Sequence, residues 1–212
     1  MQRGDDLWPE GLSRCIGTAA PTEIYVRGNL DILGEPKVAI FSSRRCPGTA
    51  ILRTYDLARA LRDAGACVIG GFHSSIKKEC LDLLLPGEAP VIVCPARTIT
   101  PYRIRGTWRK QIEAGRMLLM SPFASHHRQT TALACKRNNF VAALADLIVI
   151  ASADPGGNTE DMVRQALAWN KKLLTFDFAE NANLIEMGVD AMDIEDMVAT
   201  VKNSRHDSTQ TP

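Results

Sequence analysis

Short apolar runs alternate with longer mixed stretches along most of this chain. Each run has four or five residues and is dominated by aliphatic side chains, as in strands that are covered on both faces. The runs are bounded by glycine, proline or charged residues, which separates them from the stretches between them. We therefore predict strands at 37–41, 66–69, 90–94, 117–120, 147–150 and 173–176.

Two of the intervening stretches have the spacing of amphipathic helices. The first covers 50–64 and is followed by Gly65, a residue type that commonly ends helices. The second covers 158–170. Their apolar stripes consist of Ile51, Tyr55, Ala58 and Leu61 in the first helix and of Met162, Gln165, Ala166 and Trp169 in the second.

This succession of strands and helices predicts a single-domain α/β fold. The sheet should be doubly wound and mostly parallel, of an extended Rossmann-like type, with its ligand beyond the carboxyl ends of the strands. We expect residues 1–35 to form an irregular lead-in, in which 24–27 makes a short edge strand, and 36–202 to form the domain. The polar tail 203–212 is expected to be disordered.

Composition narrows the class of protein further. With 212 residues, 45% of them hydrophobic, the chain can bury one full core. No apolar run approaches the roughly 20 residues that span a bilayer, and no signal-peptide pattern opens the chain, so we expect a cytoplasmic protein without membrane contact. The six cysteines contain no C-x-x-C pair and the four histidines lack metal-ligand spacing, which favours reduced thiols, no metal and no cofactor.

Charge is distributed unevenly along the chain. Residues 97–137 hold nine Lys and Arg against one Asp or Glu, whereas 138–212 hold five against twelve. A basic belt with aromatic residues can follow a phosphate backbone while its rings stack on bases; it can equally be a solvated face neutralised by the acidic third. The belt comprises Arg97, Arg103, Arg105, Arg109, Lys110, Arg116, Arg128, Lys136 and Arg137, with Tyr102 and Trp108 among them.

Three predicted strand ends carry residues that suit a bound phosphate. Small residues allow a phosphate to approach the backbone, and arginine can hold it with two hydrogen bonds. After the strand at 147–150, a Pro-Gly-Gly turn leads into a helix that Asn158 or Thr159 can cap, which leaves backbone N–H groups for an anion. The candidate phosphate-binding residues are Ser42, Ser43, Arg44, Arg45, Gly70, Gly71, His73, Ser74, Lys77, Lys78, Lys136, Arg137, Asn138, Gly156, Gly157, Asn158 and Thr159.

Five short segments of the chain form a recognisable series: 23–29 (EIYVRGN), 38–44 (VAIFSSR), 68–71 (VIGG), 137–138 (RN) and 141–150 (VAALADLIVI). In their order and spacing they resemble the DNA-processing protein A (DprA, or Smf) family. The resemblance implies a non-catalytic homodimer that binds single-stranded DNA during DNA uptake and recombination in competence. It also implies that the protein hands this DNA to a RecA-type recombinase.

The resemblance assigns roles to two turns and also shows departures. Ser43 and Arg44 would lie in the family's Gly-Ser-Arg turn, and Arg137 and Asn138 in its Arg-Asn-Arg turn, both lining the DNA groove. The family's Gly-Ile-Asp step, its Phe-Pro pair and its second arginine are replaced here by 75–77, 134–135 and Asn139. A lost phenylalanine removes a stacking platform that contributes about 1 to 3 kcal/mol per base.

A second interpretation comes from the lonely-guy phosphoribohydrolases of the same superfamily. Their Pro-Gly-Gly-x-Gly-Thr-x-x-Glu turn is similar to 155–160, with Arg137 upstream, and Glu160 would be the catalytic acid. In this chain the third glycine is absent, and the acid lies closer to Thr159 than in the phosphoribohydrolase turn. Each residue of displacement along a helix rotates a side chain by about 100°, which would turn the carboxylate away from the ribose. A nucleotide-binding sensor without hydrolysis is the remaining alternative.

Overall fold

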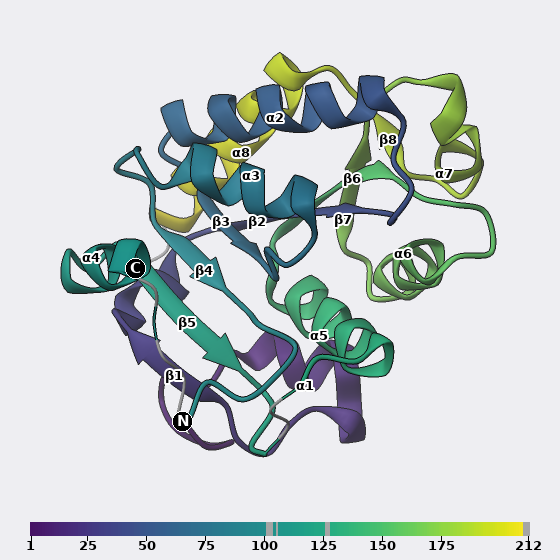
Figure 1. Ribbon diagram of the computed structural model, residues 1–212. Helices are drawn as coiled ribbons and strands as arrows, with labels where there is room; N and C mark the ends of the chain where they lie inside the picture. The colour runs from purple at the N-terminus through teal and green to yellow at the C-terminus, as the bar shows by residue number, and fades with distance from the viewer. Residues whose placement is uncertain (101–103, 105, 126–127, 210–212) are drawn as a thin grey trace.

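In a computed structural model the chain forms a single α/β domain around an eight-stranded sheet (Figure 1). The structure describes residues 1–100, 104, 106–125 and 128–209, with side chains as far as Ser204. The strands are β1 (Tyr25–Gly28), β2 (Lys37–Ser42), β3 (Cys67–Gly70), β4 (Val91–Val93), β5 (Met117–Ser121), β6 (Leu147–Ser152), β7 (Lys172–Thr175) and β8 (Asp190–Ala191).

The strand order is β1-β5-β4-β3-β2-β6-β7-β8. Every neighbouring pair is parallel except β1 with β5, so the predicted doubly wound, mostly parallel sheet is confirmed. All six predicted strands are present, as β2 to β7. The α-helices are α1 (Glu10–Ile16), α2 (Gly48–Asp63), α3 (Ser75–Leu84), α4 (Gly106–Glu113), α5 (Thr131–Leu144), α6 (Asn158–Ala168), α7 (Ala182–Glu186) and α8 (Ile194–Thr209), with 3-10 turns η1 (Gly17–Ala19), η2 (Leu30–Gly34) and η3 (Ala179–Asn181).

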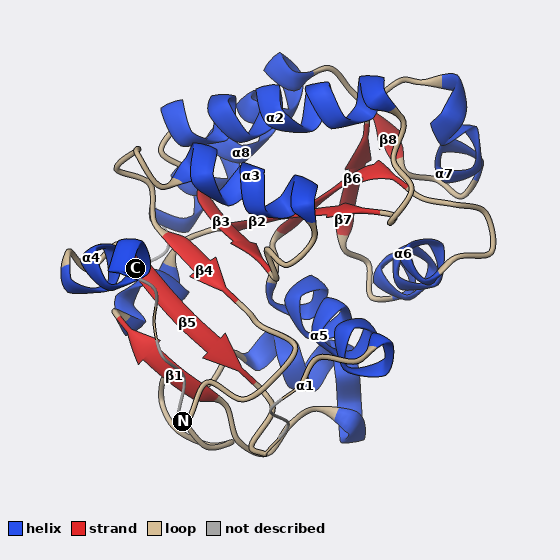
Figure 2. Cartoon of the chain, in the orientation of Figure 1, coloured by secondary structure: helices blue, strands red, loops and turns tan. Residues whose placement is uncertain are grey.

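Helices cover both faces of the sheet (Figure 2). α2, α3 and α8 pack on one face, and α1, α5 and α6 pack on the other. Neighbouring strand residues alternate between the two cores: Val68 joins the first and Ile69 the second. Both faces of these strands are therefore apolar, which explains the unbroken hydrophobic runs in the sequence.

The first 35 residues are more regular than the prediction of an irregular lead-in. They contain α1, η1, β1 and η2, and Leu12 is fully buried in the core beside α5. β1 pairs antiparallel with β5 at the edge of the sheet, so the predicted edge strand is confirmed. α1 is only seven residues long, which is too short for a helical period to stand out in the sequence.

The C-terminal end also differs from the prediction. α8 continues to Thr209, so most of the tail that we expected to be disordered is helical, while 210–212 lie outside the described residues. Ile194, Met197 and Val201 bury the first half of α8 against the core. No glycine or proline stands between them and Thr209 to end the helix. No helix in the described part of the chain is long and apolar enough to cross a membrane.

Candidate nucleic-acid interface

The loops after β2 and β6 flank the point where the winding of the sheet reverses. β2 lies between β3 and β6 in the sheet. On the β3 side the strands β4, β5 and β1 follow, and on the β6 side β7 and β8 follow. Ser43 ties the two loops together, because its backbone N–H donates to the Ser152 carbonyl (2.8 Å) and its hydroxyl accepts from the Asp154 N–H (2.8 Å). The Ser43 side chain is buried and serves this bond, whereas Arg44 and Arg45 are exposed just beyond it.

The turn before α6 is occupied by a carboxylate of the chain itself. Gly156, at φ +68°, donates its N–H to Glu160 Oε2 (3.0 Å), and Asn183 Nδ2 donates to the same oxygen (3.1 Å). The N-cap is Gly157, so the predicted capping by the Asn158 or Thr159 side chain is wrong; both residues lie in the first turn. The place expected for a phosphate therefore already holds an anion.

Glu160 has little freedom to act as an acid. Its side chain is buried and ion-paired with Arg164. The hydrogen bond from Arg164, followed by that from Asn183, lowers the pKa of the Glu160 carboxyl. The group is therefore ionised at neutral pH, which opposes the role of proton donor that the hydrolase interpretation required.

Arg137 lies inside a helix rather than in an exposed turn. It occupies the middle of α5, whose N-terminus is capped by Thr130, and its side chain is only 1% exposed. Nη1 donates to the Cys94 carbonyl (3.2 Å), Nε donates to Asn138 Oδ1 (3.0 Å), and Nη2 lies 3.0 Å from His73 Nδ1. Arg137 thus joins α5 to the ends of β3 and β4, and a direct contact with DNA is not open to it in this state.

Gly71 makes room for this guanidinium. A Cβ placed on Gly71 would lie 1.0 Å from Arg137 Nη1 and 2.0 Å from Cζ. No side chain can occupy the position unless Arg137 leaves it. The glycine after β3 is therefore required by a buried cation, in addition to any approach of phosphate.

Burial and nearby positive charges keep the His73 imidazole neutral at physiological pH. Burial, followed by the charges of Arg137, Lys77, Lys78 and Arg44, lowers its pKa to about 4. Because a guanidinium can only donate, His73 Nδ1 must accept from Arg137, which places the ring proton on Nε2. The charges of four sequence-predicted cations therefore favour the neutral form of one imidazole. Its Nε2–H can donate a hydrogen bond to an anion.

Lys77 is the most strongly perturbed of these cations. Its ammonium lies 5.4 Å from the centroid of the Phe41 ring, and the residue is half-buried in the first turn of α3. Burial and then the charge of Arg137 lower the pKa of Lys77 to about 7. Ser74 caps this helix, accepting from the Lys77 N–H (3.4 Å).

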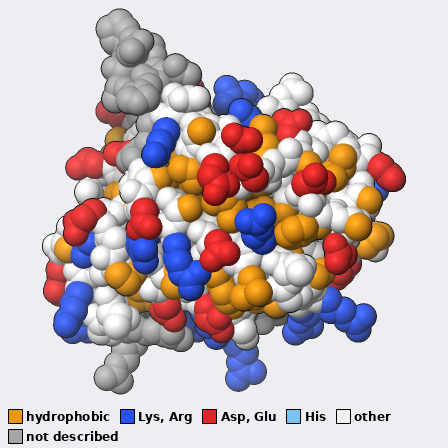
Figure 3. Space-filling view, turned by 90° about the horizontal axis from the view of Figure 1, so that it is seen from above, with side chains coloured by type: hydrophobic (Ala, Val, Ile, Leu, Met, Phe, Trp, Pro, Cys, Tyr) orange, Lys and Arg blue, Asp and Glu red, His pale blue; other side chains and the backbone are white. Residues whose placement is uncertain are grey.

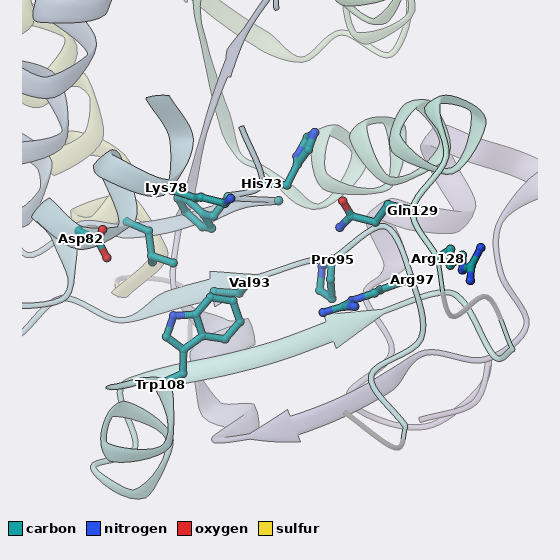
Figure 4. Close-up of a pocket in the computed structure, with 12 residues that line it drawn as sticks. His73, Lys78, Asp82, Val93, Pro95, Arg97, Trp108, Arg128 and Gln129 are labelled. Carbon is teal, nitrogen blue, oxygen red and sulfur yellow. The ribbon is translucent and has the colours of Figure 1, made fainter. Parts of the chain in front are cut away.

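A cleft of about 500 Å³ opens beside this cluster, over the carboxyl ends of β3 and β4 (Figure 4). It includes Gly71, His73 and Lys78 among the predicted phosphate-binding residues, and Arg97, Trp108 and Arg128 of the predicted basic belt. Lys136 is exposed on α5 outside the lining, and Tyr102, Arg103 and Arg105 lie outside the described residues. The remaining lining residues are Phe72, Leu81, Asp82, Val93, Pro95 and Gln129.

Sequence reasoning missed two polar residues of the cleft, Asp82 and Gln129. Asp82 is four positions after Lys78 on α3, which places both side chains on the same helical face. The i, i+4 spacing in the sequence could therefore have identified Asp82 as a neighbour of Lys78. Among the described residues, no cluster of histidine, cysteine and carboxylate side chains could hold a metal ion.

Fold and site together define a Rossmann-type α/β protein with a cationic cleft at the carboxyl ends of its strands. The family model for DNA recombination-mediator protein A matches residues 1–208, and this chain belongs to that family. A search of curated proteins finds no match.

Solved structures agree in fold with this assignment. DNA processing protein A from Streptococcus pneumoniae superposes with a TM-score of 0.78 at 20% identity, covering 94% of this chain and 72% of that one. The protein of the same name from Helicobacter pylori, described for its single-stranded DNA binding mode, gives 0.77 at 22% identity and covers 94% of both chains. A molybdenum cofactor binding protein from Rippkaea orientalis is more distant, at 0.55 and 17% identity, covering 80% of this chain and 97% of that one.

Replacing Gly71 by alanine tests the link between Gly71 and Arg137. The new methyl group must displace the guanidinium from His73 and Cys94, so we expect the free energy of unfolding to fall by about 1 to 3 kcal/mol in urea denaturation. The His73 pKa, followed by NMR, should rise from about 4 as the neighbouring positive charge moves away. Gly48→Ala is the matched control because its Cβ would meet nothing within 4 Å. Equal denaturation midpoints for wild type and Gly71→Ala would contradict the close packing.

Proposed function

We propose that this chain binds single-stranded DNA without cleaving it, along the cleft and the cations around His73. The observation that carries the proposal is the cleft at the carboxyl ends of β3 and β4, whose lining includes Lys78, Arg97 and Arg128. Positive charges held this close repel one another, and a polyanion relieves that repulsion. The nucleic-acid backbone supplies closely spaced phosphates that match such a cluster.

The shape and surroundings of the cleft favour an extended strand. The cleft is open and combines cations with the ring of Trp108, the pairing that sequence-tolerant single-strand binding uses. The face over α2 and α8 instead carries acidic and basic side chains intermixed (Figure 3). Glu160, in the first turn of α6, disfavours a small nucleotide in the turn before that helix, because its carboxylate accepts the Gly156 N–H.

Family membership also suggests the cellular process in which the chain takes part. The chain belongs to the DNA recombination-mediator protein A family, and a similar protein from Helicobacter pylori is described as binding single-stranded DNA. We infer a role in DNA uptake or recombination in the cytoplasm, with a RecA-type recombinase receiving the bound strand. The same resemblance supports a homodimer.

Salt dependence and one arginine test the DNA-binding role. In fluorescence anisotropy with a labelled thymine oligonucleotide, affinity should fall as salt rises, because bound counterions are released from the phosphates. Arg44→Ala should weaken binding and reduce the slope of log K against log salt by about 0.7 for each phosphate that is no longer neutralised. Arg53→Ala, which removes an exposed arginine from α2, should change neither quantity. Absence of DNA binding even at low salt, with binding of nucleoside monophosphates, would favour the nucleotide alternative.

Lys77 should make binding depend on pH. In the free protein its pKa is about 7, and nearby phosphates favour the charged form and raise that pKa. Binding therefore takes up a proton above pH 7, so affinity should fall as pH rises from 7 to 9 and level off below 7. Lys77→Met should flatten this dependence while weakening DNA binding at pH 6. An unchanged pH profile in this variant would exclude Lys77 as its source.

The same residue should make stability depend on pH in the opposite direction. Between pH 7 and the ordinary lysine pKa of 10.5, the unfolded chain holds a proton that the folded chain has lost. The free energy of unfolding of the free protein should therefore rise with pH across this window. Lys77→Met should remove this rise and stabilise the protein at pH 6 by an amount on the order of 1 kcal/mol.

The proposed homodimer is tested by measuring the molecular mass of the free protein in solution. Light scattering coupled to size exclusion should give twice the chain mass of 23.2 kDa for the free protein. A mass of one chain at all concentrations tested would remove the homodimer from the proposal and leave the DNA-binding site untouched.

A further inference from the structure

The two ends of the cleft differ in charge. Asp82 and Trp108 lie at one end, Arg97, Arg128 and Gln129 lie at the other, and Lys78 and His73 stand between them (Figure 4). Three cations and one carboxylate line the same cavity, and the carboxylate is separated from the two arginines. A phosphate is attracted to the arginine end and repelled from the Asp82 end. The Asp82 end therefore suits an uncharged group that accompanies a phosphate, which in a nucleic acid is a base.

Trp108 supplies an aromatic ring at that end. It projects from α4 and is partly buried against the core beneath α3, which holds the indole in place. Trp108 therefore provides an aromatic ring in the cleft lining on which a base can stack.

Asp82 adds a hydrogen-bonding preference to this surface. Its side chain is exposed on α3, and it forms no ion pair within 4.0 Å among the described residues. An ionised carboxylate only accepts hydrogen bonds, and it accepts two in parallel most favourably. Guanine presents two adjacent N–H donors on its Watson–Crick edge. In adenine, cytosine and thymine the donor on that edge stands beside an acceptor, which repels a second carboxylate oxygen.

Resting on the proposed DNA-binding function, we propose that this end of the cleft is a guanine subsite. The base stacks on Trp108 and donates its N1–H and N2–H groups to Asp82, while its phosphate lies toward Arg97 and Arg128. The cleft volume of about 500 Å³ is within the range of sites that enclose a small ligand. The protein then binds any single strand but holds it preferentially where a guanine can enter.

Competition between oligonucleotides tests the subsite. A labelled thymine oligonucleotide of about 20 residues is displaced from the wild-type protein by unlabelled thymine strands that carry one central guanine, adenine, cytosine or thymine. We expect the guanine strand to compete about tenfold better than the other three, the discrimination that one good bidentate pair gives. Asp82→Asn should abolish this difference, and it should leave affinity for the all-thymine strand equal or higher because a negative charge is removed.

Two further variants separate the contributions. Glu79→Gln makes the same charge change on the same helix, but Glu79 is hydrogen-bonded to Tyr55 and outside the cleft lining, so guanine preference should persist. Trp108→Ala should weaken all four strands by a similar factor, with Trp108→Phe intermediate, since stacking tolerates every base.

The outcomes distinguish this inference from the function on which it rests. Equal competition by all four strands, or guanine preference that survives in Asp82→Asn, overturns the guanine subsite while DNA binding stands. Failure of the wild-type protein to bind the labelled thymine strand at low salt overturns the proposed function itself.

Discussion

The buried guanidinium of Arg137 holds the functional end of this protein together. It connects α5 to the carbonyl of Cys94 beyond β4 and to His73 beyond β3, and it fills the space that a side chain on Gly71 would need. Burying a charge is costly unless the group is well hydrogen-bonded, and three partners satisfy Arg137 here. The position of His73, and with it the edge of the cleft, depends on that arrangement.

The remaining cations act from more exposed positions around this fixed point. Arg44 and Lys78 are solvent-accessible, whereas Lys77 is half-buried over Phe41 and has lost much of its preference for the charged state. The site therefore combines one structural cation, one that exchanges its proton near neutral pH and others that are exposed to solvent. Only one of these charges is fully enclosed, which limits what the cluster costs in folding free energy.

Much of the fold was predictable from the sequence, and the site only in part. Strands buried on both faces leave continuous apolar runs, so β2 to β7 were evident, whereas α1 buries a single leucine and leaves no period to detect. Of the residues that the strand ends suggested for phosphate binding, Gly71, His73 and Lys78 line the cleft, and their binding role stays a prediction. The sequence could not show that Arg137 is enclosed, because that depends on contacts with segments distant in sequence, such as Cys94. Nor could it show that the Glu160 carboxylate turns back toward the Gly156 N–H, because that depends on the side-chain conformation within the first turn of α6.

The N-terminal segment acquires importance from its packing. α1 lies against α5, close enough that a Cβ on Gly11 would stand 3.2 Å from the Ala143 carbonyl, and Leu12 is sealed beneath it. A chain trimmed to begin at residue 36 would expose this flank of α5 to water and loosen the helix that carries Arg137. Proteolytic loss of the first 35 residues would then be felt at the cleft, although none of the residues that line it belongs to this segment.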